Sequence, residues 1–230
     1  MQAWGSAAGQ GLWVHRLLGG SRMQAEELTT PVAPGSNGED VRRVQEWLNL
    51  RGFPIPITGV FGSSTAAAVV DFCHAQGVHP RSAVDRELFA LLSRPLHLAI
   101  AAGTQQALGA TVARVARLQL EHRARALAGP AGPWVRLYAG APKTSAWASA
   151  FAVWCQRRGR ALHGLPDVPA ASRAVRGSSG EVEVGDLFIA SARTGVVVGL
   201  DENGFTSIEV VNDEVASHEH PFEVCCFVQP

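Results

Sequence analysis

Cysteine and histidine are the residues of this chain best suited to nucleophilic or metal chemistry, and the sequence has four cysteines and eight histidines. No two of the cysteines, at 73, 155, 225 and 226, have the CxxC spacing typical of a zinc site. Cys225 and Cys226 are neighbours in an apolar, strand-like run, where one side chain points inward and the other outward. The pattern predicts buried free thiols, with no metal and no cofactor.

The composition indicates a globular protein. The chain has 230 residues, 47% apolar and 17% charged, enough for one large domain or two small ones. Its 20 basic and 20 acidic residues cancel, so charge gives no argument for nucleic-acid or polybasic membrane binding. No run approaches the ~20 apolar residues of a membrane-spanning helix. The N-terminus lacks the features of a secretory signal, which predicts cytoplasmic synthesis.

The charges are unevenly distributed along the chain. Residues 94–176 carry 12 basic and 2 acidic residues, whereas residues 177–230 carry 1 basic and 10 acidic residues. The two blocks either form complementary faces of one folded unit or leave a basic surface for an anionic polymer. We favour the first interpretation, because opposite charges within a domain usually offset each other locally.

Four regions are predicted: an N-terminal arm (1–35), a three-helix unit (36–93), a linker helix (94–133) and a second domain (134–230). The arm, rich in Gly, Ala and Ser, packs on the body or docks on a partner. In the three-helix unit, Asn37 and Asp40 predict a capping box, and Gly52 ends the first helix. The second helix begins after Ser63 or Ser64, and the third contains residues 88–92.

The segments GEDVRRVQEWLNLRGF, TGVFGSSTAAAVVDF and DRELFALL follow one another in residues 36–93. Together they resemble the peptidoglycan-binding domain type 1, a three-helix module that binds the bacterial cell wall. The family usually has an acidic residue where this chain has Thr58, and Gln where it has Cys73. The resemblance implies peptidoglycan as the partner. The alternative is a degenerate helper domain that fixes orientation without holding glycan.

The second half of the chain predicts a helix packed on a sheet. An amphipathic helix over 111–128 is stopped by the Gly- and Pro-rich residues 129–133. One helix then follows at 145–158, with strands at 185–189, 195–200, 208–211 and 224–228 and a turn at 202–204. Since neighbouring strands joined by short turns are antiparallel, the predicted fold class is α+β.

The segments GPWVRLYAG, AWASAFAVWCQRRG, VGDLFIASARTGVVVGLDENG and EVVND occur in this order. Over roughly residues 110–230 the chain resembles the CHAP and NlpC/P60 group of papain-like cysteine amidases and peptidases, which cut peptidoglycan. The resemblance implies a papain-like domain with a catalytic cysteine at a helix N-terminus, a histidine, and a polar residue that orients the histidine.

Two of these three catalytic roles are lost. The family cysteine follows a Trp at the start of the helix, where this chain has Ala148, and a methyl group cannot attack an amide. The family histidine precedes a Gly-Val-Val strand, where this chain has Arg193, and a guanidinium cannot act as a base. The orienting position is matched by Asn212. The resemblance therefore implies a pseudoenzyme.

Other residues are poor replacements for the missing nucleophile. Ser149 is rotated by about 100° around the helix from Ala148, and Cys155 lies two turns further on. Three bases are available, but no sequence pattern brings them beside Ser149: His163, His218 and His220. An engineered replacement of a cysteine by alanine at position 148 would not explain why Arg193 stands at the histidine position.

A groove without its nucleophile can still bind a peptide stem, and Trp147, Arg193 and Asn212 are its predicted lining. Alternatively, Trp147 and Trp154 are core anchors and Arg193 pairs with the acidic C-terminal strands. We expect an inactive peptidoglycan-binding protein that anchors or positions an assembly at the cell wall, such as a phage tail or a phage-like injection particle. The alternatives are an active amidase or endopeptidase and a purely structural assembly subunit.

Overall fold

The computed structural model describes residues 26–129, 131–140, 144, 146–167, 174–176, 182–191, 193–222 and 226–230. The helices are α3 (Glu39–Leu50), α4 (Ser63–Gln76), α5 (Arg86–Leu92), α6 (Arg94–Ile100), α7 (Leu108–Glu121), α8 (Pro133–Ala139) and α9 (Trp147–Leu162). The strands are β1 (Ala174–Arg176), β2 (Leu187–Ala190), β3 (Arg193–Leu200), β4 (Gly204–Val211), β5 (Glu214–Pro221) and β6 (Cys226–Val228). No helix in the described ranges is long and apolar enough to span a membrane.

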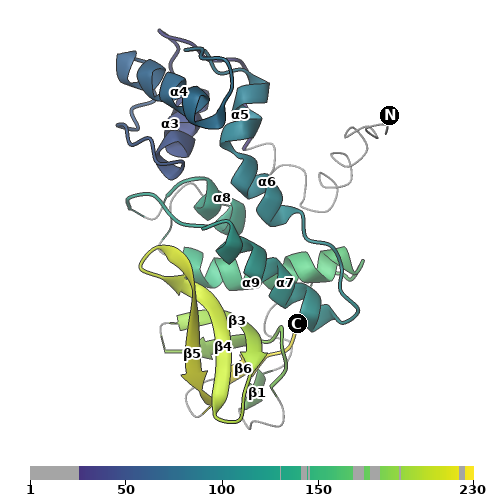
Figure 1. The fold of residues 1–230 in the computed structure, drawn as a ribbon. Coiled ribbons are helices and arrows are strands. Elements are labelled where there is room, and N and C mark those ends of the chain that lie inside the picture. Colours follow the sequence, from purple (N-terminus) through teal and green to yellow (C-terminus); the bar gives the residue numbers. More distant parts are fainter. Residues whose placement is uncertain are drawn as a thin grey trace, which may run out of the picture.

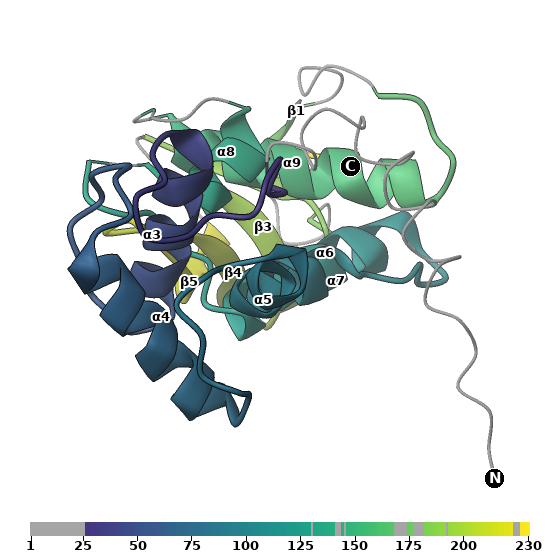
Figure 2. The same cartoon turned by 90° about the horizontal axis from the view of Figure 1, so that it is seen from above.

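The predicted α+β class is confirmed. Helices α3, α4 and α5 form a unit at one end of the molecule, and α6 leads from it to α7 and α9, which cover the sheet (Figure 1). The sheet is antiparallel with the order β1-β6-β2-β3-β4-β5. Seen from above, α3 lies beside α8 (Figure 2), and these two helices are in contact.

A buried glutamine holds the first helical unit together. Gln45 is 1% exposed, and its Oε1 accepts hydrogen bonds from the backbone N–H of Thr58 (2.9 Å) and Gly59 (2.8 Å). Its Nε2 donates to the carbonyl of Val60 (3.0 Å) and to Oγ1 of Thr65 (3.1 Å). One side chain thus joins α3, the tight turn and the start of α4. Because the amide of Gln45 is buried, its oxygen and nitrogen need such partners.

The predicted capping box at Asn37 and Asp40 is wrong. The N-cap of α3 is Gly38, with no side-chain hydrogen bond to the helix end. The Asp40 carboxylate instead accepts from the backbone N–H groups of Thr29 and Thr30, both at 3.1 Å. The Asp40 carboxylate therefore bonds to residues about ten positions earlier in the chain rather than to the start of its own helix. Gly52, directly after the C-cap, has a φ of 89°, as expected of a glycine that ends a helix.

The second half contains elements that the sequence did not predict. The helix expected over 111–128 ends at Glu121 as α7, because Arg123 has a φ of 52° and the N–H of Ala124 turns back to the carbonyl of Gln119 (3.0 Å). Helices α6 and α8 and strands β1 and β5 were also not predicted. Strand β5 adds eight residues paired to β4 along its full length.

The two faces of the sheet pack against different clusters. Val196 and Val198 belong to the main core with α7 and α9, whereas Val197, between them, belongs to a smaller cluster with Phe188 and Phe205. This alternation is the normal period of a strand. Odd-numbered residues at the start of β3 therefore face away from the helices.

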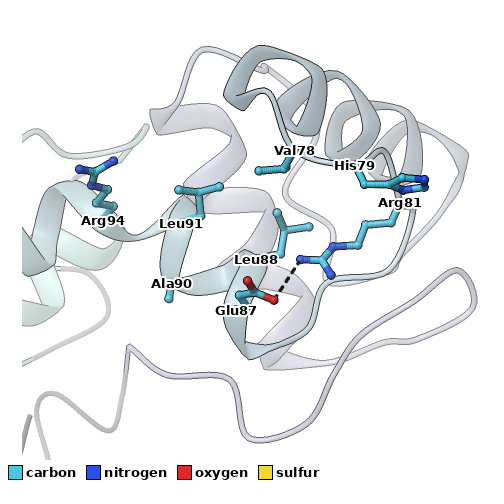
Figure 3. A pocket seen from close by; sticks show the side chains of 8 residues that line it. All are labelled: Val78, His79, Arg81, Glu87, Leu88, Ala90, Leu91 and Arg94. Atoms are coloured by element: carbon cyan, nitrogen blue, oxygen red, sulfur yellow. Dashed lines mark ion pairs between the residues drawn. The ribbon is translucent and has the colours of Figure 1, made fainter. Parts of the chain in front are cut away.

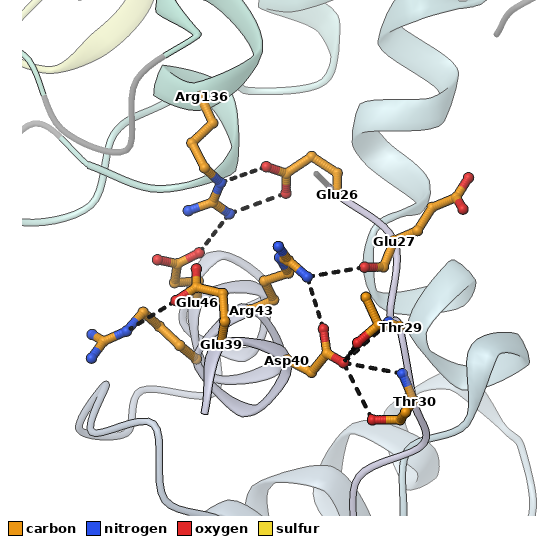
Figure 4. Close-up of polar contacts among 10 residues, drawn as sticks. Glu26, Glu27, Thr29, Thr30, Glu39, Asp40, Arg43, Glu46 and Arg136 are labelled. Atoms are coloured by element: carbon orange, nitrogen blue, oxygen red, sulfur yellow. Dashed lines mark hydrogen bonds and ion pairs between the residues drawn. The ribbon is translucent and has the colours of Figure 1, made fainter. Parts of the chain in front are cut away.

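A buried ion network joins the first helical unit to the second half (Figure 4). Arg136 on α8 donates from Nε to Glu26 (2.5 Å) and from Nη2 to Glu46 on α3 (2.7 Å). The exposed fractions of the three side chains are 12%, 1% and 7%. Beside the network, Trp47 packs edge-on against Trp134, with ring centroids 6.2 Å apart. The contact combines charge pairing with aromatic packing.

Arg136→Met will therefore destabilise the protein by about 3–5 kcal/mol, because it leaves two buried carboxylates without their cation. Chemical unfolding at neutral pH measures this loss. The control is Arg157→Met, since the ion pair of Arg157 with Asp167 is about half exposed and its loss will cost less than about 1 kcal/mol. Equal losses in the two variants would contradict the assignment.

Asp186, just before β2, is a fully buried carboxyl group. Its Oδ2 accepts from the N–H of Glu183 (3.0 Å), and its Oδ1 has no hydrogen-bond partner in the described part of the chain. Burial raises the pKa of Asp186 from 3.8 to about 6, and the charge of Glu183 acts in the same direction. The folded state therefore binds this proton more tightly than the unfolded state does.

Because the pKa of Asp186 is higher in the folded state than in the unfolded state, its ionisation destabilises the fold. The free energy of unfolding therefore falls by roughly 2 kcal/mol as pH rises from about 4 to about 6. Asp186→Asn removes the titration. Plotted against pH, the stability of the variant minus that of the natural protein will rise through this window and then level off. Unfolding curves at several pH values measure the difference, and a flat difference would show that Asp186 is not shifted.

Candidate functional site

A pocket of about 760 Å³ lies on the first helical unit, between the end of α4 and α5 (Figure 3). Aliphatic side chains and charged groups line it: Val78, His79, Arg81, Glu87, Leu88, Ala90, Leu91 and Arg94. Asp85 is the N-cap of α5: its Oδ1 accepts a hydrogen bond from the N–H of Leu88 (2.8 Å). This cap fixes the start of the helix that carries Glu87, Leu88 and Leu91.

The two arginines of the pocket are differently placed. Arg81 forms ion pairs with Asp85 (3.0 Å) and Glu87 (3.9 Å), so its charge is offset. Figure 3 shows Arg94 at the other end of the pocket. Arg94 is exposed and forms no ion pair within the described ranges. The pocket therefore offers an aliphatic floor and one guanidinium free to meet an anionic group.

The residues proposed from the cysteine-amidase resemblance do not all converge. Trp147, in the first turn of α9, is 2% exposed, stacks on Tyr138 and donates from Nε1 to Oδ1 of Asp213 (3.1 Å). It therefore lies in the core. Asn212 is the neighbour of Asp213, so the start of α9 and the β4–β5 turn do meet. Ala148 follows Trp147 and is partly buried.

Arg193 lies on the other face of the sheet. Its guanidinium donates to both carboxylate oxygens of Glu209, at 3.0 and 2.9 Å, and Glu209 is completely buried. Glu209 pairs in register with Gly195, two residues beyond Arg193, on the face away from α9. Arg193 therefore does not face Ala148. It pairs with an acidic C-terminal strand, as the alternative interpretation of the sequence has it.

Asn212 has a structural explanation in the turn between β4 and β5. Asn212 and Asp213 have φ angles of 51° and 64°, both in the left-handed region. A two-residue hairpin loop needs this conformation at both positions, and Asn and Asp tolerate it better than most residues do. The side chain of Asn212 is exposed.

Glu209 also organises a cluster that sequence patterns did not predict. Nε2 of His220 lies 2.9 Å from Oε1 of Glu209 and 3.1 Å from Oγ of Ser207. A catalytic relay needs the acid on one ring nitrogen and the hydroxyl on the other. Here both groups contact the same nitrogen, and Ser207 is fully buried. The geometry is that of a buried structural network.

The thiols in the described ranges are also unsuited to catalysis. Cys73 and Cys155 are fully buried, and burial raises the pKa of Cys155 well above its usual value, which disfavours the thiolate. Cys226 is exposed, and Cys225 lies outside the described residues. The hydroxyl of Ser149 bonds to the carbonyl of Ala146 (3.0 Å), and His163 contacts Thr111 (2.8 Å). No described cysteine is hydrogen-bonded to a histidine.

Sequence patterns missed the pocket beside α5, because only the structure separates its lining leucines from core leucines. Leu91 follows Leu88 at helical spacing, yet only Leu88 is fully buried. Leu91 instead lines the pocket, with Arg94. The ion pair between Arg81 and Asp85, in the loop before α5, was not predicted from the sequence either.

Comparison with known protein families matches residues 37–92 to the family described as "Putative peptidoglycan binding domain". The match spans α3 to α5, most of the pocket included, and ends before α6. No curated protein and no solved structure matches the chain. The predicted three-helix module is thereby confirmed, while the resemblance of residues 110–230 to cysteine amidases stays a prediction. Residues 37–92 of this chain thus match a peptidoglycan-binding family over all three helices of the first helical unit.

Proposed function

We propose that this protein binds peptidoglycan without cutting it, and that it anchors or positions an assembly at the bacterial cell wall. The observation that carries the proposal is the family match over residues 37–92, in a helical unit whose surface has an open pocket. The ligand contact is assigned to that pocket. Its size is within the range of small-molecule sites.

The lining of the pocket favours the peptide stem of peptidoglycan over its sugar rings. Sugar rings pack well on aromatic faces, and no aromatic ring other than the imidazole of His79 lines the pocket. Val78, Leu88 and Leu91 offer apolar contacts for the methyl groups of alanine residues. Arg94 offers a guanidinium for a free carboxylate, which it can bind through two parallel hydrogen bonds.

The absence of cleavage in our proposal rests on the chemistry around α9. Ala148 supplies no nucleophile, Arg193 is held by Glu209 on the opposite face, and Cys155 is buried. A papain-like ancestry for this half is part of the proposal. Of the three predicted lining residues, Trp147 is buried, Arg193 lies on the opposite face of the sheet, and Asn212 is exposed in the β4–β5 turn.

A phage tail or phage-like injection particle is the setting in which we place this protein, with residues 1–35 as the arm that meets the assembly. Residues 26–35 pack on the helical unit through Leu28 and Val32, and residues 1–25 lie outside the described part. A gene position beside tail or baseplate genes would support this setting, and a different neighbourhood would count against it.

Ala90→Glu tests the assigned pocket. Ala90 is exposed on α5, so glutamate keeps the helix while placing a like charge where the stem carboxylate binds. The fraction of protein that sediments with purified sacculi will fall about five- to tenfold, equivalent to roughly 1–1.4 kcal/mol.

The matched control is Ala67→Glu, an exposed alanine on α4 outside the pocket, which will sediment like the natural protein. Equal sedimentation of the two variants would remove the pocket from the proposal. Failure of the natural protein to sediment at moderate salt would favour the structural-subunit alternative.

A further inference from the structure

We propose that a second pocket, at the junction of the two halves, binds an oxyanion such as a phosphate or a carboxylate. This pocket has a volume of about 210 Å³ and lies between the end of α3, the start of α6 and the segment after α7. Arg51, His122, Arg123 and Arg125 line it, and Trp47 and Trp134 form its apolar wall. It is separate from the peptidoglycan pocket beside α5.

The positive charges of this pocket are largely without counter-ions. Arg51 donates to the neutral amide oxygen of Gln76 (3.2 Å), and Arg125 donates to the carbonyl of Leu50 (3.3 Å). Arg123 and His122 form no ion pair within the part of the chain that is described. Among the described residues, the one carboxylate that forms an ion pair with these groups is that of Glu214, 3.9 Å from Arg125.

Two helix ends account for only part of this charge. Arg51 and His122 are the C-caps of α3 and α7, and each helix end carries about half a negative charge. With Glu214 the total is about two negative charges, against three from the arginines. At least one positive charge remains, and Arg94 adds to it, since burial and the proximity of Arg94 lower the pKa of Arg51. An oxyanion would balance the charge.

The wider charge distribution supports this assignment. The two acidic residues of the basic block 94–176 are already paired within the block, Glu121 with Arg114 (2.8 Å) and Asp167 with Arg157 (3.1 Å). Arg125 with Glu214 is the ion pair that joins this block to the acidic block in the described ranges. The two blocks thus do not neutralise each other extensively, and the interpretation we favoured from the sequence does not account for this pocket.

The pocket is suited to a tetrahedral or planar oxyanion. Guanidinium groups bind phosphate and carboxylate through paired, charge-assisted hydrogen bonds. The pocket, of about 210 Å³, is large enough for one such group. Because Arg51 belongs to the first helical unit and Arg123 to the second half, the bound anion would bridge the two halves and stabilise their contact.

Titration calorimetry of the full-length protein with inorganic phosphate tests the site. The natural protein will bind phosphate saturably at low salt and more weakly near 0.15 M salt, where charges are screened beyond about 8 Å. Arg123→Asn will weaken binding about tenfold or more, through the loss of a charge-assisted contact. Asparagine tolerates the positive φ of Arg123, so this variant keeps the fold.

The control is Arg157→Gln, which removes a surface guanidinium elsewhere in the basic block and will leave phosphate binding unchanged. Thermal melting without phosphate verifies that each variant is folded. Displacement of phosphate by glycerol phosphate assigns the ligand to a phosphate ester, displacement by acetate assigns it to a carboxylate, and displacement by neither leaves free phosphate. Unsaturable binding by the natural protein, or unchanged binding by Arg123→Asn, would overturn the proposal.

Discussion

The contact of Arg136 with Glu26 and Glu46 constrains how the two halves of this protein can be arranged. All three groups are buried, and a buried charge is costly unless its partner is in place. Helix α8 can therefore pack against α3 only where the guanidinium meets both carboxylates. Removal of one member of such a network is costly, because it leaves a buried charge without its counter-ion. The Trp47–Trp134 contact then supplies the apolar part of the interface.

This arrangement gives the molecule two binding surfaces of different origin. The pocket beside α5 lies within residues 37–92, which match the peptidoglycan-binding family, except for Arg94 at the start of α6. The junction pocket takes Arg51 from one half and Arg123 from the other, so it exists only while the halves are docked. A wall polymer that carries peptide stems and anionic groups could engage both surfaces, which would hold the protein more firmly than either alone.

The fold was predictable where the signals were local. The three helices of residues 36–93 follow from apolar spacing and from Gly52, whereas the cap at Asn37 failed because Asp40 bonds to Thr29 and Thr30. Strand β5 was missed because polar side chains alternate around its one fully buried residue, Val215. Arg136 contacts residues 110 and 90 positions away, which no local pattern reveals. Alternate residues of β3 face opposite sides of the sheet, and Arg193 is on the side away from α9 and Ala148. The sequence does not show which side is which.

The central claim is that this chain holds the cell wall and leaves it intact. Purified sacculi incubated with the protein, followed by mass spectrometry of the soluble fraction, tests that claim most directly. The account predicts that protein is retained on the sacculi and that soluble muropeptides stay at the level of the buffer control. A time-dependent release of muropeptides that requires the protein would contradict it and assign a catalytic centre to the second half.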